Sequence, residues 1–417
     1  MGAIGALVEE GLKRGSGWAE PALLVRFGEI AVKGSYSRRK MQRLLLDNLE
    51  RALDARGVSR AGIRIEEGRI IVSRPEPMER AVEAATRVFG VVSASPCLVF
   101  EASSLEEIAE KSVELLGSSF VGKKIKVEAR RVGRHDFTSL DVARRLGSAM
   151  LERGASGVDL ERPEYTVRVE VRGKRVFLYD SVAEGPGGLP LGSEGRVLAL
   201  ISGGFDSAVA AWMMMKRGAR ADFAFFNIGG EEHAKVAREV ACYLAREWSF
   251  GHEPRLLEVE LRWMLPLLEL KFPEGFRHVA LKIAMYVGAE ALAKKYGARA
   301  LVTGESLAQV SSQTLHNLVV TEEYVEVPVL RPLIGMDKEE IIRLAKRIGT
   351  HDISVKSREF CALASPRAST SVDRDKLASL MAEHAPKDMI VERALSYHRE
   401  LRLPRDCAEP PGPASSA

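Results

Sequence analysis

The sequence predicts two consecutive α+β units followed by an α/β domain with a doubly wound parallel sheet. In the first half of the chain, short apolar runs alternate with amphipathic helical segments and one hairpin pattern. A stretch rich in glycine and proline, residues 184–192, then interrupts this pattern. From residue 196 onward, apolar strands alternate with helices, as in a parallel sheet covered by helices on both faces.

The first unit is expected at residues 20–76. Leu44, Leu45, Leu49 and Leu53 recur at helical spacing and indicate a helix with one apolar face. The predicted elements are strands at 23–27, 62–65 and 69–73 and helices at 36–56 and 76–88.

The second unit is expected at residues 77–182. Arg172-Gly173-Lys174 lies between two short apolar runs and predicts a hairpin turn. The predicted elements are helices at 105–116 and 140–153 and strands at 123–130, 166–171 and 175–179.

A linker at 183–195 precedes the third domain, at 196–400, and the tail at 401–417 is expected to be disordered. Ligands of such a sheet bind beyond the carboxyl ends of its strands. The predicted elements of the third domain are strands at 197–201, 222–227, 256–261 and 300–303 and helices at 233–247, 277–296 and 338–348.

The loop Ser202-Gly-Gly-Phe-Asp-Ser207 joins the first of these strands to a helix. A glycine-rich turn that opens a helix presents free backbone N–H groups and the positive end of the helix dipole, and it binds anions. A Walker-type loop carries a lysine, which is missing here. The pattern therefore predicts a pyrophosphate site with Asp206 as a candidate Mg²⁺ ligand. The alternative is a plain turn in which Asp206 is the helix N-cap.

Composition favours a globular protein of several domains. Of the 417 residues, 46% are hydrophobic, and no apolar run reaches the roughly 18 residues of a membrane span. The four cysteines include no C-x-x-C pair, which argues against a structural zinc site and favours a reducing cytoplasm. We therefore expect a cytoplasmic protein with no membrane partner.

The net charge of +4 is modest, but the basic residues are clustered. Residues 33–51 contain six basic and two acidic side chains, and residues 121–153 contain nine and four. Such clusters attract phosphate backbones. A solvated basic helix face is the alternative for each of them.

Seven motifs in order resemble the tRNA 4-thiouridine synthetases, the ThiI family. The resemblance implies a ferredoxin-like domain, a THUMP RNA-binding domain and a PP-loop ATP pyrophosphatase domain. We expect the form of the family without a C-terminal rhodanese domain, because this chain ends too soon for one. The motifs are Arg26-Phe-Gly-Glu-Ile-Ala-Val-Lys-Gly34, the THUMP-like segment at residues 127–179 with Asp136-Phe-Thr-Ser139 and Val158-Asp-Leu-x-x-Pro163, Gly187-Gly-Leu-Pro190, the Ser202 loop, Val302-Thr-Gly-Glu-Ser-Leu-Ala-Gln-Val-Ser-Ser-Gln-Thr314, Leu330-Arg-Pro-Leu-Ile334 and Glu359-Phe-Cys361.

The resemblance implies a two-step reaction that uses ATP and Mg²⁺. ATP first adenylates the C4 oxygen of the uridine at position 8 of tRNA, because a carbonyl oxygen is a poor leaving group. A sulfur nucleophile then displaces AMP and leaves 4-thiouridine. Some bacterial relatives also supply sulfur for thiamine biosynthesis. The positions that match the family's ATP contacts are Leu200, Ile201, Ser202, Gly203, Gly204, Ser207, Phe225, Phe226, Lys282, Gly304 and Gln313. For the two phenylalanines, ordinary core packing is the alternative.

Cys361 matches the family's catalytic cysteine and is the expected sulfur carrier or nucleophile, with a buried structural thiol as the alternative. Without a rhodanese domain, Cys407 and Cys242 are candidate resolving thiols. The expected sulfur donor is a cysteine desulfurase persulfide or inorganic sulfide. An iron–sulfur cluster is not expected, because the sequence has no C-x-x-C pair.

The resemblance assigns tRNA binding to the first two domains, which would hold the acceptor stem by its shape and phosphates. A homodimer is compatible with these expectations. The candidate RNA-binding residues are Lys123, Lys124, Lys126, Arg130, Arg131, Arg134, Arg144 and Arg145.

Two other functions compete with this one. Another PP-loop ATP pyrophosphatase, such as an amidating ligase, would leave the THUMP-like segment unexplained. A non-catalytic THUMP tRNA-binding protein would not need the intact Ser202 loop. We therefore favour the sulfurtransferase.

Overall fold

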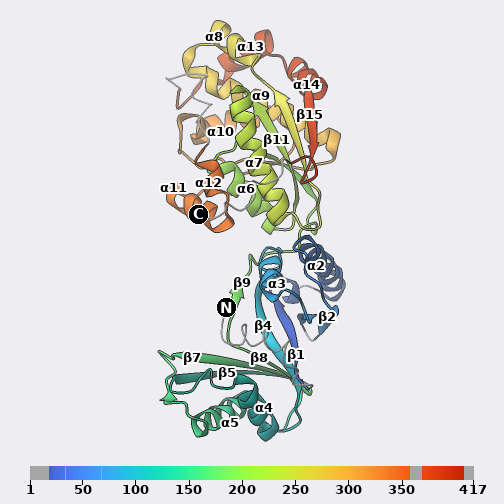
Figure 1. Ribbon diagram of the computed structural model, residues 1–417. Coiled ribbons are helices and arrows are strands. Elements are labelled where there is room, and N and C mark those ends of the chain that lie inside the picture. Colours follow the sequence, from blue (N-terminus) through green and yellow to red (C-terminus); the bar gives the residue numbers. More distant parts are fainter. Residues whose placement is uncertain (1–17, 33, 67, 357–368, 408–417) are drawn as a thin grey trace, which may run out of the picture. The chain divides into compact units, whose positions relative to one another are not determined.

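The computed structural model describes residues 18–32, 34–66, 68–356 and 369–407. It divides into two compact units, Met1–Leu189 and Pro190–Ala417 (Figure 1). Unit 1 contains one nine-stranded sheet, and unit 2 contains one six-stranded sheet. The two predicted α+β domains are therefore joined by a common sheet.

The first half of unit 1 has two helices and four antiparallel strands in the order β2-β3-β1-β4. Leu45, Leu49 and Leu53 are fully buried along α2, as their helical spacing predicts. The elements are β1 (Glu20–Phe27), a 3-10 helix (Glu29–Val32), α2 (Ser35–Ala55), β2 (Gly62–Glu66), β3 (Arg69–Ser73), α3 (Met78–Ala85) and β4 (Val91–Glu101).

This domain extends beyond the expected boundary at residue 76. Helix α3 packs against α2 and β4, and β4 pairs with β1 over eight residues of the latter, Glu20–Phe27. Helix α3, which corresponds to the predicted helix at 76–88, and β4 therefore both belong to the first α+β layer.

Strand β4 is absent from the sequence-based prediction. It contains serines and Pro96, and a proline inside a run argues against a central strand. The structure accommodates it because β4 changes partners there: Ser93 and Ala94 pair with β9, whereas pairing with β8 begins at Leu98. Pro96 thus lies between the two ladders.

The second half of unit 1 places two helices over the remaining strands. Strands β5 and β7 are parallel, β7 and β8 form the predicted hairpin, and β8 joins the sheet to β4. A capping box of Thr138 and Asp141 begins α5. The elements are α4 (Leu105–Leu116), β5 (Lys124–Val132), α5 (Ser139–Glu152), β6 (Gly157–Val158), β7 (Tyr165–Arg172), β8 (Arg175–Tyr179) and β9 (Ala183–Glu184).

Unit 2 has the predicted doubly wound sheet, in the order β14-β13-β10-β11-β12-β15. The first five strands in this order are parallel, and β15 is antiparallel to β12. The strands are β10 (Arg196–Leu200), β11 (Arg220–Asn227), β12 (Arg255–Glu260), β13 (Leu301–Val302), β14 (Val329–Leu330) and β15 (His398–Arg402).

Helix α9 (Arg277–Tyr296) is the most deeply packed helix of this unit, with twelve buried residues, and its predicted bounds are confirmed. None of the helices in the described residues has the length and apolar character needed to cross a membrane. The other helices are α6 (Phe205–Lys216), α7 (Gly230–Trp248), α8 (Met264–Lys271), α10 (Leu315–Glu322), α11 (Lys338–Ile348), α12 (His351–Ser354), α13 (Arg374–His384) and α14 (Lys387–Ser396), with 3-10 turns at Glu274–Phe276 and Ser311–Gln313.

The chain beyond residue 400 is more structured than expected. Strand β15 runs to Arg402, and a turn follows in which Asp406 accepts a hydrogen bond from the Arg402 backbone N–H at 2.7 Å. Cys407 then forms a disulfide with Cys242 on α7. Residues 401–407 therefore belong to the fold, and the expectation of a disordered tail from 401 is wrong for this part.

Candidate functional site

The candidate site lies where the winding direction of the unit 2 sheet reverses. Strands β10 and β13 are parallel neighbours, but the chain continues from β10 toward β11 on one side and from β13 toward β14 on the other. Such a reversal opens a crevice at the carboxyl ends of the two strands. The Ser202 loop follows β10, and Thr303 and Gly304 follow β13.

Gly203 gives the loop its shape. Its φ of +83° lies in the left-handed region, and a Cβ there would approach Val236 and Ala237 of α7 at 3.0 and 3.2 Å. The loop therefore lies directly against α7. A side chain at residue 203 would strain the backbone and push the loop away.

The two serines of the loop hold it closed. The Ser207 hydroxyl accepts a hydrogen bond from the Ser202 backbone N–H at 3.1 Å and donates to the Gly204 carbonyl oxygen at 3.1 Å. Helix α6 begins directly after Gly204, so its first N–H groups and dipole end point into the crevice. The alternative in which Asp206 is the N-cap is wrong, because the N-cap is Gly204.

Gly304 brings the β13 end onto the start of α6. A Cβ on Gly304 would lie 2.5 Å from the Asp206 carbonyl carbon and 2.6 Å from the Ser207 nitrogen. We expected this glycine to let the backbone approach the nucleotide. In the structure, Gly304 contacts the backbone of the Ser202 loop. This contact holds the loop against the end of β13.

Asp206 pairs with a cation that the sequence analysis missed. Lys338 donates to both carboxylate oxygens, at 2.8 and 3.0 Å, and Gln309 donates to one of them at 2.9 Å. Lys338 is the first residue of α11, and Asp337 and Glu340 form a complete capping box around it. This capping pattern can be recognised in the sequence, but it does not indicate that Lys338 faces Asp206.

Lys282 lies in a second charged cluster beside the loop. Its ammonium donates to Glu305 at 2.6 Å, and Arg331 donates to the same carboxylate at 2.9 Å. Tyr286 and Thr303 donate to it as well. Burial by itself would raise the pKa of Glu305, but Lys282, the hydrogen bonds and Arg331 outweigh it and lower that pKa to about 2.

The remaining predicted ATP contacts are largely inside the fold. Phe225 is fully buried with its ring edge against His233, and Phe226 is 5% exposed beside Gly288. Their side chains are thus core, as the alternative held, which leaves only their backbone for a ligand. Leu200 pairs with Ala224 in the β10–β11 ladder, and Ile201 donates to the Ala224 carbonyl oxygen. Gln313 accepts a hydrogen bond from the Ser306 backbone through its side-chain oxygen, at 3.2 Å.

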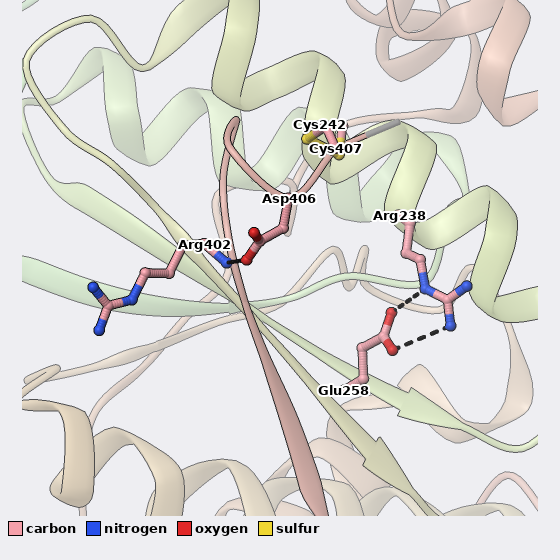
Figure 2. The surroundings of a disulfide bond; sticks show 6 residues. All are labelled: Arg238, Cys242, Glu258, Arg402, Asp406 and Cys407. Carbon is pink, nitrogen blue, oxygen red and sulfur yellow. Dashed lines mark hydrogen bonds and ion pairs between the residues drawn. A yellow bond between two sulfur atoms is a disulfide. The ribbon is translucent and has the colours of Figure 1, made fainter. Parts of the chain in front are cut away.

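The cysteines contribute little to the described part of the site. Cys361 lies outside the described residues. The two candidate resolving thiols are bonded to each other, in the disulfide between α7 and the turn after β15 (Figure 2). Cys97 is buried in unit 1. Within the described residues, no group of three or more histidine, cysteine or acidic side chains could hold a metal ion.

The predicted RNA-binding residues do not form a single cluster. Arg130 lies opposite Glu170 in the register of the parallel β5–β7 ladder. It projects from the same face of β5 as Lys124 and Lys126. Arg131 projects from the opposite face, against which α5 packs, and donates to the Gly133 carbonyl oxygen. Partners on the strand face are acidic: Lys126 lies 3.0 Å from Glu128, and Lys124 lies 3.7 Å from Asp159. The predicted residues on α5 and in the flanking turns are Lys123, Arg134, Arg144 and Arg145.

Comparisons with known proteins agree with this arrangement. The family described as "Thiamine biosynthesis protein (ThiI)" matches residues 192–384, a THUMP domain matches 102–180, and a ThiI ferredoxin-like domain matches 22–95. A "Probable tRNA sulfurtransferase" of Aeropyrum pernix is 48% identical over 386 residues, covering 91% of this chain and 97% of the relative. A "tRNA sulfurtransferase" of Desulfurococcus amylolyticus is 42% identical over 379 residues, covering 90% and 77%.

A solved 4-thiouridine synthetase–RNA complex with bound ATP superposes with a TM-score of 0.79 at 29% identity, over 92% of this chain and 99% of that one. The fold and the site thus define a PP-loop nucleotide-binding domain preceded by ferredoxin-like and THUMP domains. The chain belongs to the ThiI family of tRNA sulfurtransferases.

Proposed function

We propose that this chain is an ATP-dependent tRNA sulfurtransferase that converts the uridine at position 8 of tRNA into 4-thiouridine. The observation that carries the proposal is the Ser202–Ser207 loop at the sheet reversal, closed by its own serines and bordered by Lys338. Its support is membership of the ThiI family and similarity to a solved 4-thiouridine synthetase–RNA complex with bound ATP.

In the first step, the loop and α6 hold the phosphates while the uridine O4 attacks the α-phosphorus. The bond between the α- and β-phosphates breaks, and pyrophosphate leaves with both bonding electrons. The N–H groups at the start of α6 and the ammonium of Lys338, which lies beside the loop, would stabilise this negative charge. Lys282 is a second cation at the same edge.

Magnesium would be held here by Asp206. Its carboxylate is 24% exposed and is the acidic group of the loop. Mg²⁺ usually binds proteins through one or two carboxylates and takes its other ligands from phosphate oxygens and water. The single carboxylate of Asp206, to which Lys338 and Gln309 donate in the structure, would hold the ion together with the phosphate oxygens of ATP. When bound, the ion would neutralise phosphate charge.

In the second step, a sulfur nucleophile attacks C4 of the adenylated uridine, and AMP leaves. We assign sulfur delivery to Cys361 as the carrier of a terminal persulfide. After attack, the bond between the two sulfurs must be cleaved by a thiol that becomes oxidised to a disulfide with Cys361. Cys242 or Cys407 could supply that thiol only after an external thiol reductant opens the bond between them.

The decisive experiment incubates the protein with tRNA, Mg·ATP and either sulfide or a cysteine desulfurase with cysteine, followed by nucleoside analysis. We expect 4-thiouridine together with AMP and pyrophosphate in equal amounts. If ATP binds but no donor yields 4-thiouridine, the proposed function is wrong, and another PP-loop reaction or plain tRNA binding takes its place.

A further inference from the structure

We infer that Glu305 is a positioning residue that fixes the Lys282 ammonium beside the phosphate loop. This inference rests on the proposed function for its substrate, ATP. Glu305 is 5% exposed, and its carboxylate receives hydrogen bonds from Lys282, Tyr286, Thr303 and Arg331. No ATP contact is assigned to Glu305 itself.

The carboxylate joins three separate elements at the sheet edge. Lys282 and Tyr286 project from successive turns of α9, whereas Thr303 and Glu305 follow β13, and Arg331 follows β14. The two carboxylate oxygens divide these partners: Lys282 is on Oε1, and Tyr286, Thr303 and Arg331 are on Oε2. One oxygen is therefore held in place by the protein while the other holds the lysine.

A lysine needs such a partner to act at a fixed point. Its flexible four-carbon stem loses rotamer entropy when it is held in one position. The Lys282 side chain is 20% exposed, so solvent reaches it, whereas the Glu305 side chain is 7% exposed. A buried, multiply bonded carboxylate is thus the rigid member of the pair.

The position of Glu305 is also tied to the phosphate loop. Its neighbour Gly304 packs against the backbone of Asp206 and Ser207 so closely that a Cβ would lie 2.5 Å from the nearest atom. Glu305, which binds Lys282, therefore directly follows the residue that contacts the start of α6. Any shift of Glu305 would move the ammonium relative to the loop.

The test compares Glu305→Gln with Glu322→Gln by direct titration with Mg·ATP. Glu322 is the matched control, because it also pairs with Arg331, at 2.6 Å, but from a position that is 47% exposed. Removing the Glu305 charge is expected to weaken ATP binding about 10- to 100-fold, as for the loss of hydrogen bonds to charged groups. The Glu322 variant should bind ATP within about twofold of the wild type.

A double-mutant cycle separates positioning from general stability. In a Lys282→Met background, Glu305→Gln should cause no further loss of ATP affinity, because both changes remove the same interaction. If the losses of ATP affinity in the two single variants multiply in the double variant, Glu305 acts independently of Lys282, through the fold. That result would overturn the inference. If Glu305→Gln does not fold, Glu305→Asp keeps the charge and withdraws it from Lys282, and it should also weaken binding; unchanged affinity there would contradict the inference. Wild-type ATP binding without 4-thiouridine formation would refute the proposed function alone.

Discussion

The ammonium of Lys338 lies against both carboxylate oxygens of Asp206, at 2.8 and 3.0 Å. The pair joins the first turn of α6 to the first residue of α11, and the capping box of α11 fixes where that residue stands. A cation and a carboxylate thus meet beside the loop that we propose holds the pyrophosphate.

Replacing Lys338 with glutamine is expected to lower kcat/KM for adenylation by about 100- to 1000-fold, the cost of removing one preorganised donor from a charged transition state. Pyrophosphate formation in the presence of tRNA measures the effect. The matched control is Lys346→Gln, an exposed lysine near the other end of the same helix. Equal activity of the two variants would show that Lys338 pairs with Asp206 only in the absence of nucleotide.

The sequence predicts the phosphate loop well because the loop is local. Strand, paired glycines and helix follow one another within residues 196–216, and each leaves its own pattern. Asp206 and Lys338 are 132 residues apart, and Lys282 and Glu305 are 23 apart in different elements. No periodicity specifies such pairs, since they depend on which strand ends meet at the sheet edge.

The missed strands have a similar cause. Strand β4 breaks the usual rule with Pro96, and β15 is a charged sequence, His398-Arg-Glu-Leu-Arg402, with one buried residue. Both are stabilised by partners far along the chain, β1 and β12 respectively. Local propensity is weak where pairing of this kind determines the structure.

Gly304→Ala is expected to disrupt the loop, because the added methyl would collide with the backbone at the start of α6. We predict loss of measurable ATP binding and a free energy of unfolding lowered by about 1–3 kcal/mol. Gly335→Ala is the matched control, because a Cβ there meets nothing within 4 Å. ATP affinity that survives in the Gly304 variant would contradict the close contact.

Opening the disulfide between Cys242 and Cys407 is expected to destabilise unit 2. The bond closes a segment of 165 residues and ties the turn after β15 to α7, which also pairs with β12 through Arg238 and Glu258 (Figure 2). Cys242→Ser should lower the free energy of unfolding by about 2–4 kcal/mol in urea, and adding Cys407→Ser should have no further effect. Reductant should destabilise the wild type but not the variant. Equal stability of all forms would show that the bond contributes nothing.

The same variants test the resolving-thiol proposal. A resolving thiol cleaves the bond between the two sulfurs in every turnover, so with a persulfide donor its loss should slow the release of 4-thiouridine from the first turnover onward unless an external thiol replaces it. Unchanged turnover in both single variants, with and without reductant, would exclude Cys242 and Cys407 from that role.

The basic residues of β5 and of α5 should contribute unequally to RNA binding, because they project from different sides of the sheet. We expect the strand face to be the contact. The triple variant of Lys124, Lys126 and Arg130 to glutamine should reduce the salt slope of tRNA affinity by about 2. The helix variant, Arg144→Gln with Arg145→Gln, is the control and should change the slope by less. A slope unaffected by the triple variant would remove the strand face from the interface.

His233 gives the stability of unit 2 a distinct pH dependence. It is 5% exposed on α7, with its ring 4.6 Å from that of Phe225. Burial lowers its pKa from 6.5 to about 4, partly opposed by a hydrogen bond with the backbone of Ser202. The folded state therefore keeps the imidazole neutral at pH values where the unfolded chain protonates it.

The direction of the pH dependence of stability follows from this difference in proton binding. Between about pH 6.5 and pH 4 the unfolded chain binds more protons, so stability is fully present above pH 6.5 and falls as the pH is lowered, by up to roughly 3 kcal/mol. Urea unfolding of wild type and His233→Asn at several pH values measures it. The variant should be less stable at pH 7.5 but should show a flatter profile in this window. His384→Asn on α13 serves as the control. A wild-type profile that parallels that of His233→Asn would mean that His233 does not carry this proton linkage.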